Sequence, residues 1–159
     1  PMTYVRWLAL GGFIAATLAT GAVGGLATAS SVGSWYPTLA KPAWNPPSWV
    51  FGPVWSTLYL LMAVAAWRVW RHREHPQRRG ALAWFLVQLA LNALWSVLFF
   101  GLRRPDLALI EIVILLATLV ATGWKFWGID RVAALLWAPY VAWVGFATVL
   151  NGTIWWLNR

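Results

Sequence analysis

The chain has 159 residues, of which 61% are hydrophobic and only 10% are charged, and its mean hydropathy is +0.65. A soluble domain typically carries about a quarter charged residues, so 12 Lys and Arg with 4 Asp and Glu exclude an ordinary soluble surface. The absence of cysteine excludes disulfides, iron–sulfur clusters and thiolate metal sites. The net charge of +8 could suit nucleic acid, but the basic residues lie mainly in short gaps between apolar runs, where membrane proteins place them. We therefore expect a membrane protein with no nucleic-acid partner.

Five apolar segments are each long enough to cross a bilayer, which takes roughly 20 residues of helix. The sequence predicts an all-α, integral membrane bundle of five transmembrane helices in one domain, over residues 7–29, 47–70, 80–101, 107–127 and 131–158. Pro47 suits the first turn of the second helix, and Asp106 suits the N-cap of the fourth. Pro139 is tolerated within the fifth helix because neighbouring helices can satisfy the freed carbonyl. The polar segment 30–45 is predicted to be a loop.

The distribution of Lys and Arg predicts the orientation of the bundle in the membrane. With five crossings, one side carries Arg6, Arg68, Arg71, Arg73, Arg78, Arg79, Lys125 and Arg131, and the other carries Lys41, Arg103, Arg104 and Arg159. The richer side is normally cytoplasmic, so we expect the N-terminus in the cytoplasm and the loop 30–45 outside. The apolar run after Arg6 is also too long for the core of a cleavable signal peptide, which spans about 7–15 residues.

Tryptophan is the most unusual feature of the composition, with 15 residues. Tryptophans near helix ends are typical of the membrane–water interface. That explanation fits Trp95 and Trp143 poorly, because both lie deeper in predicted helices. It also does not account well for the cluster of Trp35, Trp44, Trp49 and Trp55. An indole offers a broad polarizable face and one N–H donor, which suits a flat aromatic ligand or a sterol. These residues either line a ligand pocket or pack the bundle.

Three predicted helices carry polar and aromatic residues on one face. The faces are Trp55, Tyr59, Met62 and Ala66 in the second helix; Gln88, Asn92, Trp95 and Phe99 in the third; and Tyr140, Trp143, Ala147 and Asn151 in the fifth. Asn92 falls near the middle of the bilayer, where an amide must contact protein or a cavity. It either ties helices together through a hydrogen bond or contacts a ligand. Three such faces favour a cavity over a solid core.

Other polar and small residues were weighed for chemistry. Glu111 is the only carboxylate well inside a predicted helix; it either complements the helix dipole and pairs with Arg103 or Arg104, or takes part in proton transfer. His72 and His75 lack further ligands that would complete a metal site, so we expect no metal and no required cofactor. The spacing of small residues at Gly21 and Gly25 allows close helix contact, within the chain or between subunits.

Several motifs resemble those of the TspO/MBR family, also described as translocator proteins or tryptophan-rich sensory proteins. They are Trp35-Tyr36, Leu39, Lys41-Pro42, Trp44, Pro46-Pro47, Trp49, Pro53, Trp55 and Leu58-Tyr59; then Gln88 to Asn92, Trp95 and Phe99-Phe100-Gly101; and Pro139-Tyr140, Trp143, Phe146-Ala147-Thr148 and Leu150-Asn151. The resemblance covers nearly all of the chain from Trp35 onward, and it is closest to bacterial members.

The resemblance implies five transmembrane helices in a bacterial cell envelope, usually as a homodimer, with a pocket near the first loop. Family members bind porphyrins such as protoporphyrin IX and haem; many bind benzodiazepine-type and isoquinoline ligands, and animal members bind cholesterol. Carried over by motif, the ligand-binding residues here are Trp44, Trp49, Trp55, Asn92, Trp95, Tyr140, Trp143, Ala147 and Leu150. Some bacterial members degrade protoporphyrin in light, and the two tryptophans implicated match Trp55 and Trp143.

The sequence departs from the animal pattern at two places. Gly152 follows Leu150-Asn151 where the sterol-recognition pattern of animal members has Tyr, which argues against a sterol as native ligand. Leu107 stands where animal members place a further pocket Trp. The expected function is a membrane receptor or sensor that binds porphyrin or a similar flat hydrophobic ligand and influences its transport or disposal. The alternatives are an enzyme for light-dependent porphyrin degradation and a carrier for lipophilic metabolites, sterols included.

The loop 30–45 is expected to fold over the pocket mouth as a lid. A span of this length without helical periodicity is usually functional or disordered, and its aromatic content is unlike that of a disordered linker. The alternative is that its rings lie in the headgroup region as a membrane-surface anchor.

Overall fold

A computed structural model describes residues 2–159 as a bundle of five long helices. They are α1 (Met2–Ala29), α2 (Ser48–Arg71), α3 (Arg78–Ser96), α4 (Pro105–Ile129) and α5 (Arg131–Leu157). Each is long and apolar enough to cross a membrane, α3 together with the short turn that follows it. A helix satisfies its backbone polar groups internally, which lipid cannot do for it. The predicted all-α, five-helix class is confirmed, and the protein is a multi-pass integral membrane protein.

Three helices begin earlier than the charge pattern predicts, and α3 is one of them, starting at Arg78 instead of Gly80. Helix α1 starts at Met2, so Arg6 lies inside it rather than before it. Helix α4 starts at Pro105, whose missing N–H costs nothing in a first turn. The prediction that Asp106 is its N-cap is therefore wrong: Arg104 occupies the N-cap, and Asp106 lies in the first turn, where its charge still complements the helix dipole. A helix can continue past the lipid, so a charged residue does not fix its end.

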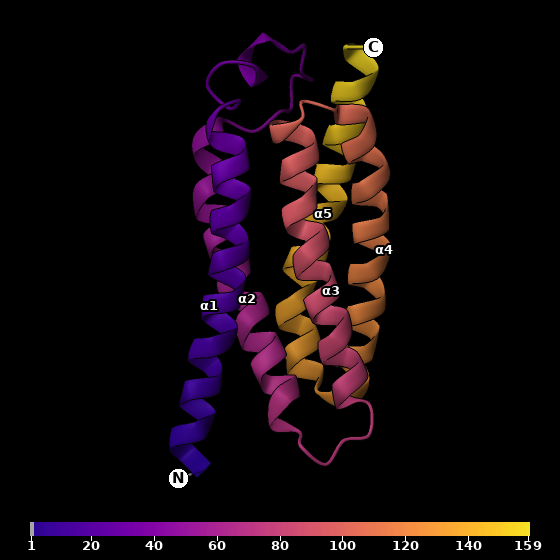
Figure 1. Ribbon diagram of the computed structural model, residues 1–159. Helices are drawn as coiled ribbons and strands as arrows, with labels where there is room; N and C mark the ends of the chain where they lie inside the picture. The colour runs from indigo at the N-terminus through magenta and orange to yellow at the C-terminus, as the bar shows by residue number, and fades with distance from the viewer. Residues whose placement is uncertain (1) are drawn as a thin grey trace.

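The helices run alongside one another along the length of the bundle (Figure 1). Helix α1 packs against α2, α2 against α5, α5 against α4, α4 against α3, and α3 returns to α1. The first loop, residues 30–47, contains the short 3₁₀ turn η1 (Tyr36–Thr38) and lies at the same end as the C-terminus. The N-terminus and the α2–α3 connection lie at the opposite end. We call these the loop end and the N-terminal end.

The backbone is irregular where α3 reaches the loop end. Residues Val97–Gly101 form η2, a π-helical turn, in which the N–H of Leu102 donates to the carbonyl of Val97 at 2.8 Å. Arg103 follows with a φ of +54°, a left-handed conformation that is uncommon for a residue other than glycine. The hydroxyl of Ser31 donates to the carbonyl of Phe100, so the first loop satisfies an acceptor that the end of the helix leaves free.

The solid part of the core lies between the middle of the bundle and the N-terminal end. Trp137 is fully buried there, with its ring edge-on to Phe126 and Tyr140 at centroid distances of 5.1 and 5.2 Å. Its indole N–H donates to the carbonyl of Leu119 at 3.1 Å. Gly123 makes room for this ring, since a Cβ at that position would lie 3.2 Å from it. Side chains therefore fill the half of the bundle that is nearer the N-terminal end.

Candidate ligand-binding cavity

A cavity of about 360 Å³ lies between the filled core and the first loop. All five helices contribute to its wall, and so does the first loop. None of the described residues that line it is charged. Its volume falls within the range of roughly 300–1,000 Å³ that is usual for small-molecule sites. The structure thus contains a cavity of the kind that the polar and aromatic helix faces predicted.

Three tryptophans from three different helices form much of the aromatic wall. Trp55 of α2 lies 5.6 Å from the ring of Tyr59, measured between centroids. Trp95 of α3 stacks on Phe99 at 5.1 Å. Trp143 of α5 lies 6.0 Å from Phe51. These contacts hold the indole rings against neighbouring side chains and leave part of each ring facing the cavity.

A chain of four polar side chains crosses the bundle beside the cavity. The hydroxyl of Tyr59 donates to Oδ1 of Asn92 at 2.6 Å, and Nδ2 of Asn92 donates to the hydroxyl of Tyr140 at 2.7 Å. The Tyr140 hydroxyl in turn donates to Oε1 of Gln88 at 2.8 Å. One amide therefore joins α2, α3 and α5, which is the structural role weighed for Asn92 in the sequence. Asn92 also lines the cavity, so the two roles are compatible.

A second polar chain fixes Trp95. Its indole N–H donates to Oδ1 of Asn151 at 2.9 Å, and Nδ2 of Asn151 donates to the carbonyl of Pro105 at 2.9 Å. These bonds connect α3, α5 and the first residue of α4. Because Asn151 is buried, both halves of its amide need partners, and both have them.

Small residues of α1 form the side of the cavity opposite α4. Gly21 is closest to another helix: a Cβ there would lie 2.8 Å from Cε2 of Tyr59. Gly25 lies one turn further along and has no side-chain neighbour within 4 Å of that position. The small-residue spacing predicted from the sequence therefore serves contact within the chain at Gly21 and open cavity space at Gly25.

The first loop closes the cavity at the loop end. Val32 and Tyr36 line it, and Tyr36 is buried against Phe99 and Phe100, at centroid distances of 6.2 and 5.5 Å. The Tyr36 hydroxyl donates to Oδ1 of Asn45 at 3.0 Å. Burial raises the pKa of this hydroxyl above its usual value, and the bond to Asn45 opposes the rise. These contacts cover the cavity with the loop, as a lid would require.

The predicted ligand-binding residues fall into two groups. Trp55, Asn92, Trp95, Trp143, Ala147 and Leu150 line the cavity. The other three do not. Trp44 is half-exposed and packs on Phe146 at 5.7 Å, Trp49 is three-quarters exposed, and Tyr140 is fully buried behind Asn92. Tyr140 therefore reaches the cavity only through lining residues, by its bond to Asn92 and by its ring, which lies 6.2 Å from that of Trp55.

Several cavity residues were not among those predicted from the sequence. Phe51, Gly52 and Ser96 line the wall, as do Gly21 and its neighbours on α1. The small-residue line of α1 was a usable signal, since a helix without side chains on one face leaves space beside it. Ser96 and Gly52 carry no distinctive pattern, and only the packing of the helices reveals them.

Glu111 has neither of the partners that the sequence suggested. Arg103 donates to the hydroxyl of Ser31 at 3.1 Å, and Arg104 pairs with Asp106 at 2.8 Å. Both carboxylate oxygens of Glu111 are buried, and among the described residues neither has a hydrogen-bond partner. Because α4 begins at Pro105, Glu111 also lies beyond the first turn, where the helix dipole acts most strongly. The predicted ion pair is therefore wrong.

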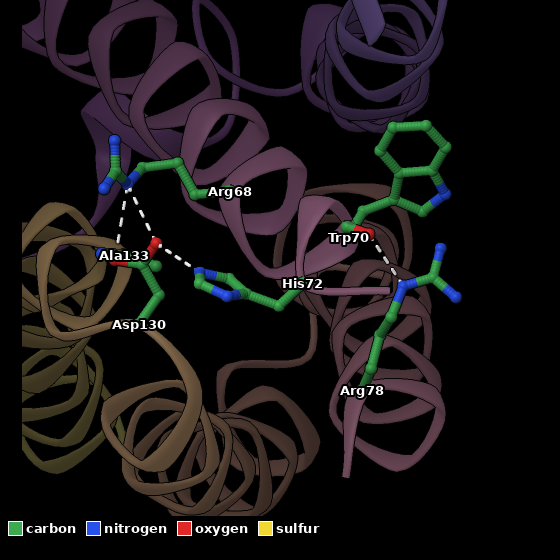
Figure 2. A network of polar contacts seen from close by, with 6 residues as sticks. All are labelled: Arg68, Trp70, His72, Arg78, Asp130 and Ala133. Atoms are coloured by element: carbon green, nitrogen blue, oxygen red, sulfur yellow. Dashed lines mark hydrogen bonds and ion pairs between the residues drawn. The ribbon is translucent and has the colours of Figure 1, made fainter. Parts of the chain in front are cut away.

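At the N-terminal end, Asp130 connects three helices. Figure 2 shows its carboxylate between Arg68 and His72, with Nε of Arg68 at 3.2 Å and Nε2 of His72 at 3.0 Å. It also caps α5 by accepting the backbone N–H of Ala133 at 3.0 Å. Burial alone would raise the pKa of Asp130, but the hydrogen bonds from His72, Ala133 and Arg68 hold it below its usual value. His72 thus takes part in a structural contact with Asp130, and the described residues contain no cluster of metal ligands.

Fold and site together define a small polytopic membrane protein with an internal, uncharged, tryptophan-lined cavity. Residues 13–157 match the TspO/MBR family, so the chain belongs to that family. It is 44% identical over 117 residues to the tryptophan-rich sensory protein of Cereibacter sphaeroides, covering 74% of this chain and 72% of the relative. It is 40% identical to the tryptophan-rich protein TspO of Archaeoglobus fulgidus, covering 91% and 94%. The human translocator protein is 38% identical, covering 76% and 73%.

Proposed function

We propose that the protein is a membrane receptor or sensor that binds a porphyrin, such as protoporphyrin IX or haem, or a similar flat hydrophobic ligand in the cavity. Binding would influence the transport or disposal of that ligand. The observation that carries the proposal is that Trp55, Trp95 and Trp143 border one uncharged cavity from three helices. The names of the relatives, a sensory protein and a translocator protein, support a receptor or sensor role.

The hydrogen-bonding state of the three indoles supports a ligand that carries polar atoms. The N–H of Trp95 is occupied by Asn151. Within residues 2–159, no side chain or backbone group accepts the N–H of Trp55 or of Trp143. Two residues that line the cavity therefore carry an indole donor with no partner among the described residues, beside broad aromatic faces. A flat ring system with peripheral or central acceptor atoms satisfies both features.

The size of the cavity adds a condition. A volume of about 360 Å³ lies near the lower end of the range for small-molecule sites. A macrocycle as large as a porphyrin therefore needs the first loop to move outward when it binds. The proposal thus includes the lid role of the first loop, which Val32 and Tyr36 support by lining the cavity.

A second candidate function is the light-dependent oxidative degradation of protoporphyrin IX, in which Trp55 and Trp143 would contact the ligand. Trp55 and Trp143 line the same cavity, so one bound porphyrin would reach both indoles, which supports this alternative. A third possibility, a carrier for lipophilic metabolites, predicts binding with no change in the ligand.

The test is a titration of the purified protein in detergent with protoporphyrin IX, first in darkness and then in light. The blocking variant is Ala147→Phe, because Ala147 lines the cavity and a phenyl ring there would fill it. The matched control is Ala142→Phe, which adds the same ring to an exposed position of the same helix.

A receptor should quench or shift porphyrin fluorescence in darkness, with affinity at least about tenfold weaker in A147F and unchanged in A142F. A new absorbance product that appears only in light, and only when Trp55 and Trp143 are intact, would favour the enzyme. Equal affinity of A147F and the wild-type protein would contradict the cavity as the porphyrin site.

A further inference from the structure

A second pocket lies at the N-terminal end of the bundle, far from the tryptophan-lined cavity. It has a volume of about 640 Å³ and is lined by Arg6 of α1, by Trp70 and Arg71 of α2, and by residues 72–76 of the α2–α3 connection. Three separate segments of the chain therefore meet there. The proposed function does not use this pocket.

The pocket carries an excess of positive charge. Its lining includes Arg6, Arg71 and Arg73, against the single acidic residue Glu74. Within residues 2–159, these three arginines make no ion pair; Asp130, the nearby acid, pairs with Arg68 and contacts His72. Arg78 and Arg79 add further charge close by: the guanidiniums of Arg73 and Arg78 both lie over the ring of Trp70, at 4.8 and 5.6 Å from its centre, and like charges this close repel one another. An anion bound here would relieve this repulsion.

Aromatic rings hold the guanidiniums in place. The guanidinium of Arg71 lies 4.7 Å from the ring centre of Trp67, and that of Arg73 lies 4.8 Å from the ring centre of Trp70. Stacking occupies the flat face of a guanidinium and leaves the N–H groups at its edge free. Trp67 also donates its indole N–H to the backbone carbonyl of Arg6 at 2.8 Å, which fixes α1 beside α2. The guanidiniums of Arg71 and Arg73 are thus held in place without a bound ligand.

The location indicates which anion fits. Trp67 and Trp70 lie in the last turns of a membrane-spanning helix, and tryptophans at such positions lie at the level of lipid headgroups. Basic pockets between transmembrane helices at that level suit the phosphate of an anionic lipid. We propose that the pocket formed by Arg6, Arg71 and Arg73 binds the phosphate group of an anionic phospholipid.

The experiment compares lipids bound to the full chain by native mass spectrometry, after incubation in a neutral detergent with equal amounts of phosphatidylglycerol and phosphatidylcholine. The test variant is Arg71→Gln with Arg73→Gln. The control is Lys125→Gln with Arg131→Gln, which removes the same charge from two cations that stack on Trp84 and Trp127 outside the pocket. Arg6→Gln is a single variant that removes one pocket charge. It keeps the contact between α1 and α2, because Trp67 bonds to the backbone of Arg6 and not to its side chain. A helical circular dichroism spectrum verifies that each variant is folded.

We expect the wild-type protein to retain phosphatidylglycerol in preference to phosphatidylcholine, and the double pocket variant to lose about ten- to thirtyfold of that preference. The control pair should keep it, and R6Q should lose several-fold. A loss of equal size in the control would mean that the lipid preference comes from the overall positive charge of the N-terminal end, and it would overturn the proposal. Displacement of phosphatidylglycerol by millimolar inorganic phosphate would also overturn it, by making free phosphate the ligand.

Discussion

The side chain of Asn158 forms hydrogen bonds with both backbone polar groups of Ala40. Its Oδ1 accepts the N–H of Ala40 at 2.9 Å, and its Nδ2 donates to the Ala40 carbonyl at 2.8 Å. Nδ2 also donates to the carbonyl of Ile154 at 2.7 Å, which anchors the amide to the end of α5. This pairing joins the first loop to the last helix beside the cavity.

Asn158→Ala should loosen the first loop without unfolding the bundle. Two hydrogen bonds worth roughly 0.5–1.5 kcal/mol each would be lost, which predicts at least about fivefold faster hydrogen exchange at residues 36–41 and faster porphyrin release. Hydrogen exchange read by mass spectrometry checks the first effect, and stopped-flow dissociation checks the second. Thr153→Ala is the control, because its hydroxyl bonds only to its own helix. Unchanged exchange in N158A would mean that other contacts hold the loop.

Gly21→Ala should destabilise the protein, because the added methyl group would lie 2.8 Å from the Tyr59 ring. That ring cannot move freely, since its hydroxyl bonds to Asn92 at 2.6 Å. We expect a loss of roughly 1–3 kcal/mol, typical of overpacking. Gly12→Ala is the control, with open space at its Cβ and the better helix propensity of alanine. Thermal unfolding followed by circular dichroism measures both, and equal melting temperatures in the two variants would contradict the tight contact.

The positions of the helices could be predicted from the sequence because lipid imposes a simple rule on composition. Charged residues gather in the gaps, so five spans follow from the apolar runs. Helix faces could be predicted as well: Trp55, Asn92, Trp95 and Trp143 lie on three predicted helices, and all four line one cavity. Periodicity reports which residues share a face, and the resemblance to a known family indicated which faces meet.

Features that depend on pairing between helices could not be predicted. Asn92 was left between two roles because its partners, Tyr59 and Tyr140, lie 33 and 48 residues away. Closeness in sequence suggests Arg103 or Arg104 as one possible partner of Glu111, yet those arginines bond elsewhere. The π turn at Val97–Gly101 has no distinctive sequence pattern, so its presence at the end of α3 could not be predicted.

Glu111→Leu should stabilise the protein. The carboxyl group is buried without a hydrogen-bond partner among the described residues, and an unsatisfied buried polar group costs roughly 1–3 kcal/mol. Leucine has a similar size and removes that cost, so the melting temperature should rise in detergent. A fall would show that the carboxyl has a favourable partner, such as a bound water or cation. If stability rises while porphyrin binding falls, Glu111 serves function at the expense of stability.

Asp130→Asn separates the cap of α5 from the ion pairs. Asparagine still caps a helix, so the backbone bond to Ala133 can persist, while the charge that attracts Arg68 and His72 is lost. We expect a loss of up to about 1 kcal/mol near neutral pH. Because the pKa of Asp130 is lowered by folding, its contribution is complete above the ordinary carboxyl value of about 3.9 and disappears as the pH falls through the lowered value. Chemical unfolding of both proteins across this range should show the difference shrinking in acid; a constant difference would contradict the ionic contribution.

The π turn and the left-handed Arg103 make the two ends of the bundle mechanically unequal. Both irregular segments lie beside the first loop, since Ser31 bonds to the carbonyl of Phe100 and to the side chain of Arg103, so irregular backbone is gathered at the loop end. At the other end, Asp130 holds α2 to the start of α5 through Arg68 and a helix cap. A deformation that admits a ligand would follow the softer end and leave the stiffer end in place. The cavity would then open toward the loop end and stay closed toward the N-terminal end.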